Sequence, residues 1–315
     1  MSSDNSDVSI DPYHDPQPPM DVPHHWHVEA LWQQLSTLLP GVSIEVVART
    51  ESTNTALLER VRKESRGPEG DRQAYGRRQH DMQPCLLVAE HQTQGRGRMG
   101  RPWVSAPGAS LTFSLGVVLD MEDWSGLSLA VGCAVADALE PLAEGQAPRL
   151  QLKWPNDIWL VNEAGGRKLG GILIETVPAG AQRMAIVGIG LNISEQAVGA
   201  HHEGMSAPVF STGFAALSEF YPPEAPAPTA PDVLACIAPA LARALHDFPQ
   251  AGFAPWQAAY ARRDLTLNRA VSAGTLEGIS RGVDAGGNLQ VETADGVVQP
   301  VSGGEVSVRL TGGKA

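Results

Sequence analysis

A chain of 315 residues, 43% of them hydrophobic, has room for one large domain and one small domain around a sizeable core. Its formal net charge of −12 argues against a general nucleic-acid binder, which needs a basic face, and against docking on anionic lipid. Any polyanion that this protein binds must therefore be met by a local group of positive side chains.

Residues 1–22 predict a disordered tail, because they are acidic and rich in proline. They lack the basic start and apolar run of a signal peptide, and the sequence contains no apolar stretch long enough to cross a bilayer. The cysteines, Cys85, Cys133 and Cys236, are too widely spaced for a CxxC pair or a metal cluster. We therefore expect a cytoplasmic protein with reduced thiols and no membrane partner.

Helix and strand patterns mix along most of the chain. They predict helices over 26–39, 52–64, 127–142, 231–248 and 253–264, and strands over 42–50, 85–92, 109–119, 150–160, 168–177 and 183–193. The helix over 127–142 is too densely apolar to face solvent, so we expect it to be buried. Two polar or proline-rich stretches, 65–83 and 222–231, read as loops without an evident chemical role.

The pattern of the sequence changes at about residue 266. Short apolar runs from there on are separated by Gly-Gly, Asp-Gly and Gly-Asn turn signals, which is typical of a small β-barrel or sandwich. The fold class is therefore α+β, with a mixed sheet packed with helices and a small β domain at the C-terminus. The expected division is a tail over 1–22, a main domain over 23–265 and the β domain over 266–315.

The stretch 90–103, EHQTQGRGRMGRPW, gathers arginine and glycine in a chain that is otherwise acidic. Three of each occur within seven residues: Gly95, Arg96, Gly97, Arg98, Gly100 and Arg101. Glycine lets a backbone approach a ligand closely, and arginine holds phosphate or carboxylate with a planar fork. Neither a Walker loop nor a dinucleotide fingerprint fits the spacing. The alternative to an anion-binding loop is a solvated surface turn.

Arginines as close as these repel one another. The composition therefore predicts a loop that cannot hold itself rigid and that packs well only around an anion. We expect the loop to be mobile when empty and to become ordered when its ligand arrives.

KWPND, at 153–157, places Lys153, Asn156 and Asp157 where Pro155 must interrupt a strand. Asp157 would bind Mg²⁺ or orient a polar group, and its alternative role is to cap the turn. Asn192, at the end of GIGLN, also has a functional and a structural interpretation. It would either contact an adenine edge or close a turn.

Lysine is rare in this chain, which has only Lys63, Lys153, Lys168 and Lys314. Two of the four lie inside short motifs, KWPND and GRKLGG. An ammonium group is a compact charge that suits a substrate carboxylate about to meet a phosphate. Together with the arginines, these lysines predict a site for two anions side by side, where positive charge promotes formation of an acyl-phosphate bond. A carboxylate nucleophile needs no general base, and no Ser/His/Asp or Cys/His arrangement stands out.

The motifs resemble, in their order, those of the biotin–protein ligases. They are STN (52–54), EHQTQGRGRMGRPW (90–103), KWPND (153–157), RKLGGILIE (167–175), GIGLN (188–192), ISRGVD (279–284) and GGEVSVR (303–309). The resemblance implies a catalytic domain like that of class II aminoacyl-tRNA synthetases and an SH3-like C-terminal β-barrel. It also implies that biotin and Mg-ATP form biotinyl-5′-AMP, which then acylates one lysine of a biotin carboxyl carrier protein of acetyl-CoA carboxylase or a related carboxylase.

The resemblance also assigns roles to individual residues. The catalytic residues would be Lys168, Asp157 and Arg98. The biotin contacts would be Ser52, Thr53, Asn54, Gln92, Gly95, Arg96, Gly97, Arg98 and Lys168. The ATP contacts would be Arg96, Arg98, Arg101, Trp103, Lys153, Asn156, Asn192 and Arg309. No fixed metal cluster is expected; Mg²⁺ would arrive with ATP, and Asp157 is its candidate ligand.

Three of these assignments keep an alternative. Trp103 would pack under the loop rather than touch a ligand. Lys153 would either contact the phosphates or have only a structural role at the end of its strand. The segment 163–166 lengthens the turn before RKLGG, which puts the placement of Lys168 in question, and Glu305 would support the turn that carries Arg309.

Some bacterial members of this family carry an N-terminal winged helix-turn-helix and repress transcription. Residues 1–42 read mostly as a tail, so we expect neither a repressor role nor binding to nucleic acid. The residues do not choose between a monomer and a homodimer. The rival functions are a lipoate-type acyl ligase, which needs a longer apolar pocket, and a regulator that only senses biotinyl-AMP, which needs a DNA-reading element.

Overall fold

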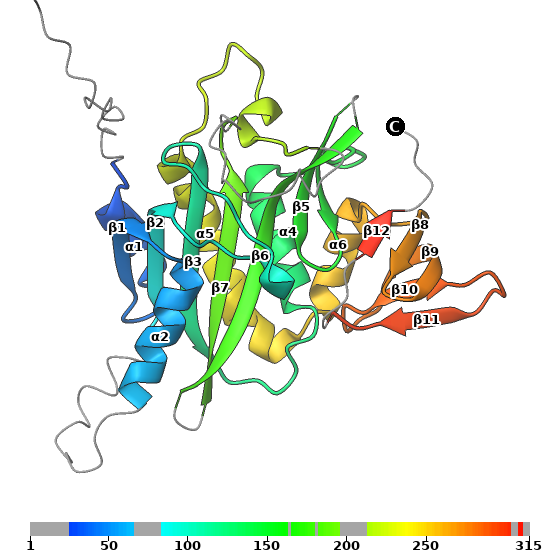
Figure 1. Ribbon diagram of the computed structural model, residues 1–315, viewed down its shortest axis with the longest axis horizontal. Helices are drawn as coiled ribbons and strands as arrows, with labels where there is room; N and C mark the ends of the chain where they lie inside the picture. Colours follow the sequence, from blue (N-terminus) through cyan, green and yellow to red (C-terminus); the bar gives the residue numbers. More distant parts are fainter. Residues whose placement is uncertain are drawn as a thin grey trace, which may run out of the picture.

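The computed structural model describes residues 25–65, 83–162, 165–179, 182–195, 213–303 and 308–310. A large sheet with helices on both faces occupies most of the molecule, and a small second sheet lies at one end (Figure 1). The expected tail over 1–22 and most of the expected loop over 65–83 lie outside the described residues.

The large sheet has seven strands in the order β1-β2-β3-β7-β6-β5-β4. They are β1 (Ser43–Thr50), β2 (Cys85–Gln92), β3 (Ser110–Leu119), β4 (Leu150–Lys153), β5 (Asp157–Asn162), β6 (Gly165–Ala179) and β7 (Gln182–Asn192). β1 and β2 run parallel and the other neighbours run antiparallel, so the sheet is mixed, as expected.

One strand prediction was wrong. The stretch 150–160 was expected as a single strand, but it forms β4 and β5, which pair antiparallel across a tight turn at residues 154–156. Proline has no N–H to donate to a ladder, so the chain reverses at Pro155, whose peptide bond with Trp154 is cis. The reversal places Lys153 directly opposite Asp157.

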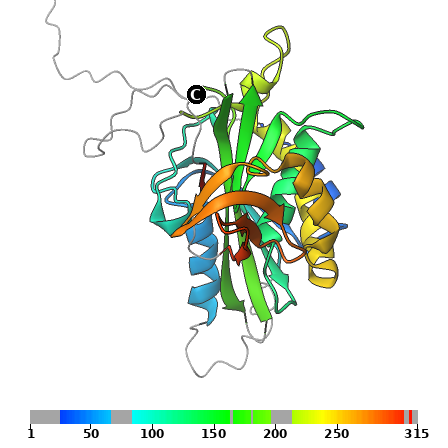
Figure 2. The same cartoon turned by 90° about the vertical axis from the view of Figure 1, so that its right-hand side faces the viewer.

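The helices cover the two faces of the sheet unequally. They are α1 (Val28–Leu35), α2 (Thr53–Ser65), α4 (Leu127–Leu139), α5 (Ala230–Ala251) and α6 (Gln257–Arg263), with short 3₁₀ helices η2 (Arg98–Gly100), η3 (Leu217–Phe220) and η4 (Ala254–Trp256). Seen edge-on, the sheet separates α2 from the layer that contains α4, α5 and α6 (Figure 2). As expected, α4 is buried along most of its length, because it lies between the sheet and α5.

This layering explains the apolar patterns in the strands. In β3, Leu111, Phe113 and Leu115 face the larger core under α4 and α5, while Ser110 and Ser114 face the α2 side. β2 is apolar on both faces, since Leu86 enters the larger core and Leu87 enters a smaller core beneath α2. Within α2, Lys63 and Glu59 form an i,i+4 ion pair, with Lys63 Nζ 3.5 Å from Glu59 Oε2.

The C-terminal segment forms an antiparallel five-stranded sheet, as its turn signals indicated. Its order is β11-β10-β9-β8-β12, with β8 (Ala270–Ala273), β9 (Leu276–Val283), β10 (Leu289–Glu292), β11 (Val298–Val301) and β12 (Val308–Leu310). The turn between β4 and β5 contacts this sheet, because Trp154 Nε1 donates to Gly287 O at 3.0 Å. None of the helices in the described part of the chain is both long enough and apolar enough to span a membrane.

Candidate functional site

The floor of the candidate site is the part of the large sheet just beyond the start of α2. On the α2 face, β3 and β7 change from apolar residues under the helix to small or polar ones beyond it. On β7 these are Gly188, Gly190 and Asn192, which share one face because strand residues alternate. The result is a shallow polar floor with room for side chains from α2 and from the arginine–glycine segment.

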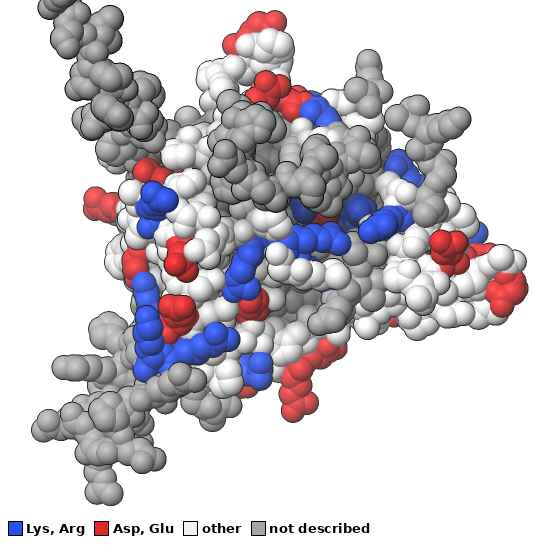
Figure 3. Space-filling model, viewed as in Figure 1, with Lys and Arg blue, Asp and Glu red and all other residues white. Residues whose placement is uncertain are grey.

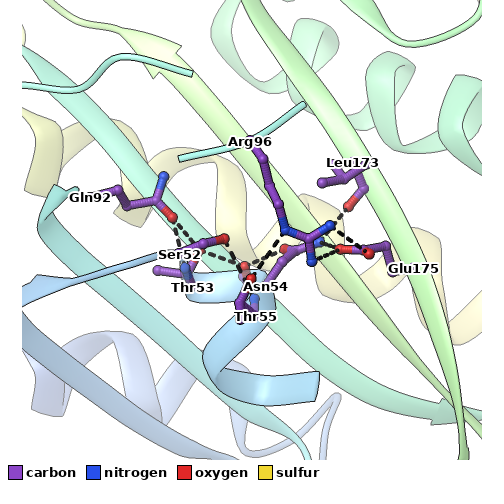
Figure 4. A network of polar contacts seen from close by, with 9 residues as sticks. Ser52, Thr53, Asn54, Thr55, Gln92, Arg96, Leu173 and Glu175 are labelled. Atoms are coloured by element: carbon purple, nitrogen blue, oxygen red, sulfur yellow. Dashed lines mark hydrogen bonds and ion pairs between the residues drawn. The ribbon is translucent and has the colours of Figure 1, made fainter. Parts of the chain in front are cut away.

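The predicted biotin contacts from STN and Gln92 do come together on this floor (Figure 4). Gln92 Oε1 accepts hydrogen bonds from Thr53 N at 2.7 Å and from Thr53 Oγ1 at 3.2 Å. Asn54 Nδ2 donates to Leu173 O at 3.2 Å, and Ser114 Oγ lies 2.6 Å from Asn54 Oδ1 and 2.7 Å from Thr53 Oγ1. Thr53 and Asn54 therefore hold the floor together through buried hydrogen bonds within the protein.

The arginine–glycine loop, defined here as residues 95–103, folds back on itself above this floor. Trp103 N donates to Gly95 O and Gly97 N donates to Arg101 O, both at 2.7 Å. Gly100 has a φ of 68°, in the left-handed region that glycine adopts without strain. The loop thus has its own backbone hydrogen bonds.

The repulsion expected among the three arginines is relieved for one of them, Arg96. Arg96 is neutralised within the protein, since its Nη1 and Nη2 contact the two oxygens of Glu175 at 2.9 and 2.8 Å. Arg98 Nη2 donates to Gly303 O at 2.6 Å. The carboxylate neutralises Arg96, whereas the positive charge of Arg101 still acts on Arg98. Ordering of the loop by a ligand stays a prediction.

Two glycines of GIGLN permit close approach of side chains to β7. A Cβ added at Gly190 would lie 2.6 Å from Cε2 of the Trp103 ring, and one at Gly188 would lie 2.1 Å from Asn54 Oδ1. Trp103 therefore packs on the strand under the loop, as expected. Among the residues that the structure describes, its Nε1–H is buried without a hydrogen-bond partner.

We expect Gly188→Ala to displace Asn54 and to destabilise the protein by about 1–3 kcal/mol, the usual range for overpacking. Denaturant unfolding measures this loss. Gly116→Ala is the matched control, because its Cβ would first meet the movable tip of Ile186 at 3.2 Å. Equal losses of stability in the two variants would contradict this account of Gly188.

Lys168 and Asp157 form an ion pair next to the loop. Lys168 Nζ lies 2.7 Å from Asp157 Oδ1, and both side chains are about one-fifth exposed, at 19% and 22%. The pairing of β5 with β6 shifts between Ile158 and Trp159, so this bulge redirects the end of β6. It leaves Leu169 in the larger core and turns Lys168 to the α2 face beside Asp157. Part of the longer turn over 163–166 lies outside the described residues, and the catalytic placement of Lys168 stays a prediction.

The remaining predicted ATP contacts surround this pair. Burial lowers the pKa of Lys153, and the negative charge of Asp157 opposes this lowering. Three positive side chains lower the pKa further: Lys168, Arg101 and Arg309. Burial also lowers the pKa of Arg98, again opposed by Asp157. We call the five cations the cation cluster: Arg98, Arg101, Lys153, Lys168 and Arg309. Lysine and arginine form a row across the middle of this face, in a chain whose net charge is negative (Figure 3).

The lowered pKa of Lys153 gives a test of its role. As the pH rises, its ammonium loses the proton earlier than an ordinary lysine would, so a phosphate contact weakens in that alkaline range. We expect KM for ATP to rise there, and we expect Lys153→Arg, which stays charged, to abolish the rise. If KM for ATP rises equally at alkaline pH in the wild type and in Lys153→Arg, Lys153 has only a structural role at the end of its strand.

Two other predicted contacts have protein partners. Asn192 Nδ2 donates to Ala215 O at 3.1 Å, which ties β7 to the segment before η3. Asn156 Nδ2 donates to Ile172 O at 2.7 Å, which leaves its side-chain carbonyl oxygen available as an acceptor. Glu305 lies outside the described residues.

Sequence reasoning missed Glu175 and Ser114 as members of this site. Glu175 ends the RKLGGILIE motif, but nothing in the motif indicates which side chain it meets. For Ser114, the alternation of polar and apolar residues in SLTFSL, 110–115, indicated a polar strand face and could have drawn attention to it.

Comparison with known proteins identifies the family. One family model, the biotin/lipoate A/B protein ligase family, matches residues 46–192, and another, the biotin protein ligase C terminal domain, matches residues 266–309. The chain is 33% identical over 285 residues to the bifunctional ligase/repressor BirA of Escherichia coli (strain K12), covering 88% of this chain and 77% of that protein. Absence of a repressor role in this chain stays a prediction.

A second relative and a solved structure agree with these matches. The chain is 34% identical over 254 residues to the biotin–[acetyl-CoA-carboxylase] ligase of Paracoccus denitrificans, covering 78% of this chain and 92% of that one. The structure of a biotin protein ligase from Aquifex aeolicus in complex with biotin and ATP superposes with a TM-score of 0.62 and 25% identity, covering 85% of this chain and 99% of that chain. With these matches, the chain belongs to the biotin protein ligase family.

Proposed function

We propose that this protein is an ATP-dependent biotin–protein ligase, which makes biotinyl-5′-AMP and transfers its biotin to one lysine of a biotin carboxyl carrier domain. The observation that carries the proposal is the placement of the cation cluster beside the polar floor. The arginine–glycine loop connects the polar floor to the cation cluster. Arg96 hydrogen-bonds to Glu175 on the floor, and Arg98 lies close enough to Asp157 for the carboxylate to raise its pKa against the effect of burial. The site can thus bind an uncharged polar ring on the floor and two anions at the cation cluster at the same time.

In the first step, a carboxylate oxygen of biotin attacks the α-phosphorus of ATP, and pyrophosphate leaves with the electrons of the broken P–O bond. Both reactants are anions, so their approach is opposed by charge repulsion. Lys168 lies on β6, between β7 of the floor and β4, which carries Lys153, and it would hold the carboxylate against the phosphate. Preorganised charges of this kind stabilise a transition state without needing to reorganise.

In the second step, the neutral amine of the carrier lysine attacks the acyl carbon of the adenylate, and an amide forms as AMP leaves. The amine gives up one proton. The arginine–glycine loop would cover the mixed anhydride until the carrier arrives, because an exposed anhydride reacts with water and with any nearby amine. Ser52 and Gln92 would contact the ureido ring, while Thr53 and Asn54 hold the floor.

The residues at this site fit Mg²⁺ bound together with ATP. Within the described ranges there is no group of three or more His, Cys, Asp or Glu side chains that could hold a metal alone. Asp157 and the carbonyl oxygen of Asn156 offer the hard oxygen donors that Mg²⁺ prefers, and the phosphates would supply others. Bound there, Mg²⁺ would neutralise phosphate charge.

The finer structural and biological assignments are also proposals. We place a catalytic domain of the class II aminoacyl-tRNA-synthetase type over 23–265 and an SH3-like domain over 266–315, supported by the second family model, which begins at residue 266. The partner would be the carrier protein of acetyl-CoA carboxylase, because relatives bear that name. The reaction would take place in the cytoplasm, where ATP and apo-carboxylases are found.

Titration calorimetry separates the biotin ligase from a lipoate-type ligase. With ATP present, we expect biotin to bind far more tightly than lipoate, since Thr53, Asn54, Gln92 and Ser114 form a compact polar floor rather than a long apolar tunnel. Tighter binding of lipoate would reject the proposal.

A further inference from the structure

Glu175 lies on β6 at one end of the polar contacts drawn in Figure 4. Its carboxylate meets two elements that are distant in sequence. From the arginine–glycine loop, Arg96 places both terminal nitrogens on it, at 2.9 and 2.8 Å. From the start of α2, Asn54 Nδ2 donates to it at 2.9 Å. The same carboxylate therefore holds both parts of the candidate biotin pocket.

The surrounding contacts leave these groups little freedom. Arg96 Nε donates to Thr55 Oγ1 at 3.1 Å, so three nitrogens of the guanidinium face protein acceptors. Asn54 is buried, and Ser114 fixes its other amide atom. The chain of contacts connects β3, α2, β6 and the loop. A guanidinium held in this way is a fixed point of the loop, whereas Arg98 and Arg101 lie further along it.

We propose that Glu175 is a positioning residue of the ligase: it fixes Arg96 as the pivot of the arginine–glycine loop and aligns Asn54 on the floor, so that Arg98 and Arg101 are the loop arginines that meet the anions. This inference rests on the proposed function. It implies that a neutral residue at 175 frees Arg96, which is one-third exposed at 34%, to turn toward solvent or toward a substrate anion.

The test compares two variants that each remove one Arg–Glu pair. Glu175→Gln keeps the size of the side chain and loses its charge. Glu45→Gln is the matched control, because Glu45 pairs with Arg60 in the same two-point manner, at 2.7 and 2.8 Å, between β1 and α2. Both side chains of the control pair are 38% exposed, against 34% and 25% for Arg96 and Glu175.

We expect Glu175→Gln to raise KM for biotin at least tenfold in a pyrophosphate-release assay, with a smaller change in kcat, and to increase biotinylation of bystander protein severalfold. Glu45→Gln should stay within twofold of the wild type in all three. A purely structural role would give similar kinetics in the two variants when their thermal unfolding midpoints shift equally, and that result would overturn the inference.

Arg96→Gln reaches the same contact from the loop side and does not alter the sheet, so it tests the inference even if Glu175→Gln folds poorly. If the two residues act as one unit, the double variant is no worse than the more impaired single variant. If the losses of activity in the two single variants add in the double variant, Glu175 does not act through Arg96. A wild type that forms no adenylate from biotin and ATP would reject the proposed function itself, which the comparison of variants does not.

Discussion

Lys168→Ala should lose adenylate formation by a factor on the order of 10²–10³, the range seen when one preorganised charge or donor is removed from a transition state. The β5–β6 bulge turns the Lys168 ammonium to the α2 face beside Asp157, where two anions would meet. Alanine leaves their repulsion uncompensated at that point. The measurement is pyrophosphate release with biotin and ATP at saturation.

The fold should survive this change. The side chain does not enter either apolar core, and Asp157 keeps the nearby positive charges of Arg98 and Lys153. Lys63→Ala is the control, since Lys63 pairs with Glu59 on an exposed part of α2, and it should release pyrophosphate at the wild-type rate. Near-normal pyrophosphate release by folded Lys168→Ala would remove Lys168 from the chemistry.

Arg98→Gly should release the reactive adenylate, so that biotin appears on lysines of unrelated proteins added to the reaction. Arg98 connects the arginine–glycine loop to the segment after β11 through Gly303 O, and burial lowers the pKa of its guanidinium. Without that side chain the loop covers the site less often. Mass spectrometry of an added bystander protein measures the leak, which we expect to rise at least tenfold.

Met99→Gly is the matched control for this variant. Met99 is the next residue in the loop, is largely exposed, and has a φ of 55°, a conformation that glycine adopts easily. Its replacement should leave the anchor at Arg98 intact and biotinylation confined to the carrier. An equal leak from both variants would mean that any loosening of the loop suffices and that Arg98 has no special part.

The strands and helices were predictable where one physical pattern dominates. The strand over 85–92 is buried on both faces and matches β2 residue for residue, and the apolar helix that starts at 127 is α4. The strand over 150–160 failed because a local pattern does not show where a chain reverses. The signal was Pro155, which was taken to interrupt a ladder rather than to turn the chain.

The site was predictable by residue type, but its internal pairing was not. Motifs indicated Arg96, Asn54 and Lys168, whereas their partners depend on which strands become neighbours. Arg96 and Glu175 are 79 positions apart, and Asn54 and Glu175 are 121 apart. For the same reason the sequence did not show that Arg96 is neutralised, since its carboxylate partner belongs to another element.

Transfer of labelled biotin to an isolated biotin carboxyl carrier domain, followed in a single turnover, is the decisive test of the proposed ligase activity. We expect label on one carrier lysine only when ATP is present, AMP in equal amount, and no label on a carrier with arginine at that lysine. No transfer from enzyme that has already formed biotinyl-5′-AMP, or transfer that proceeds without ATP, would contradict the proposed activity.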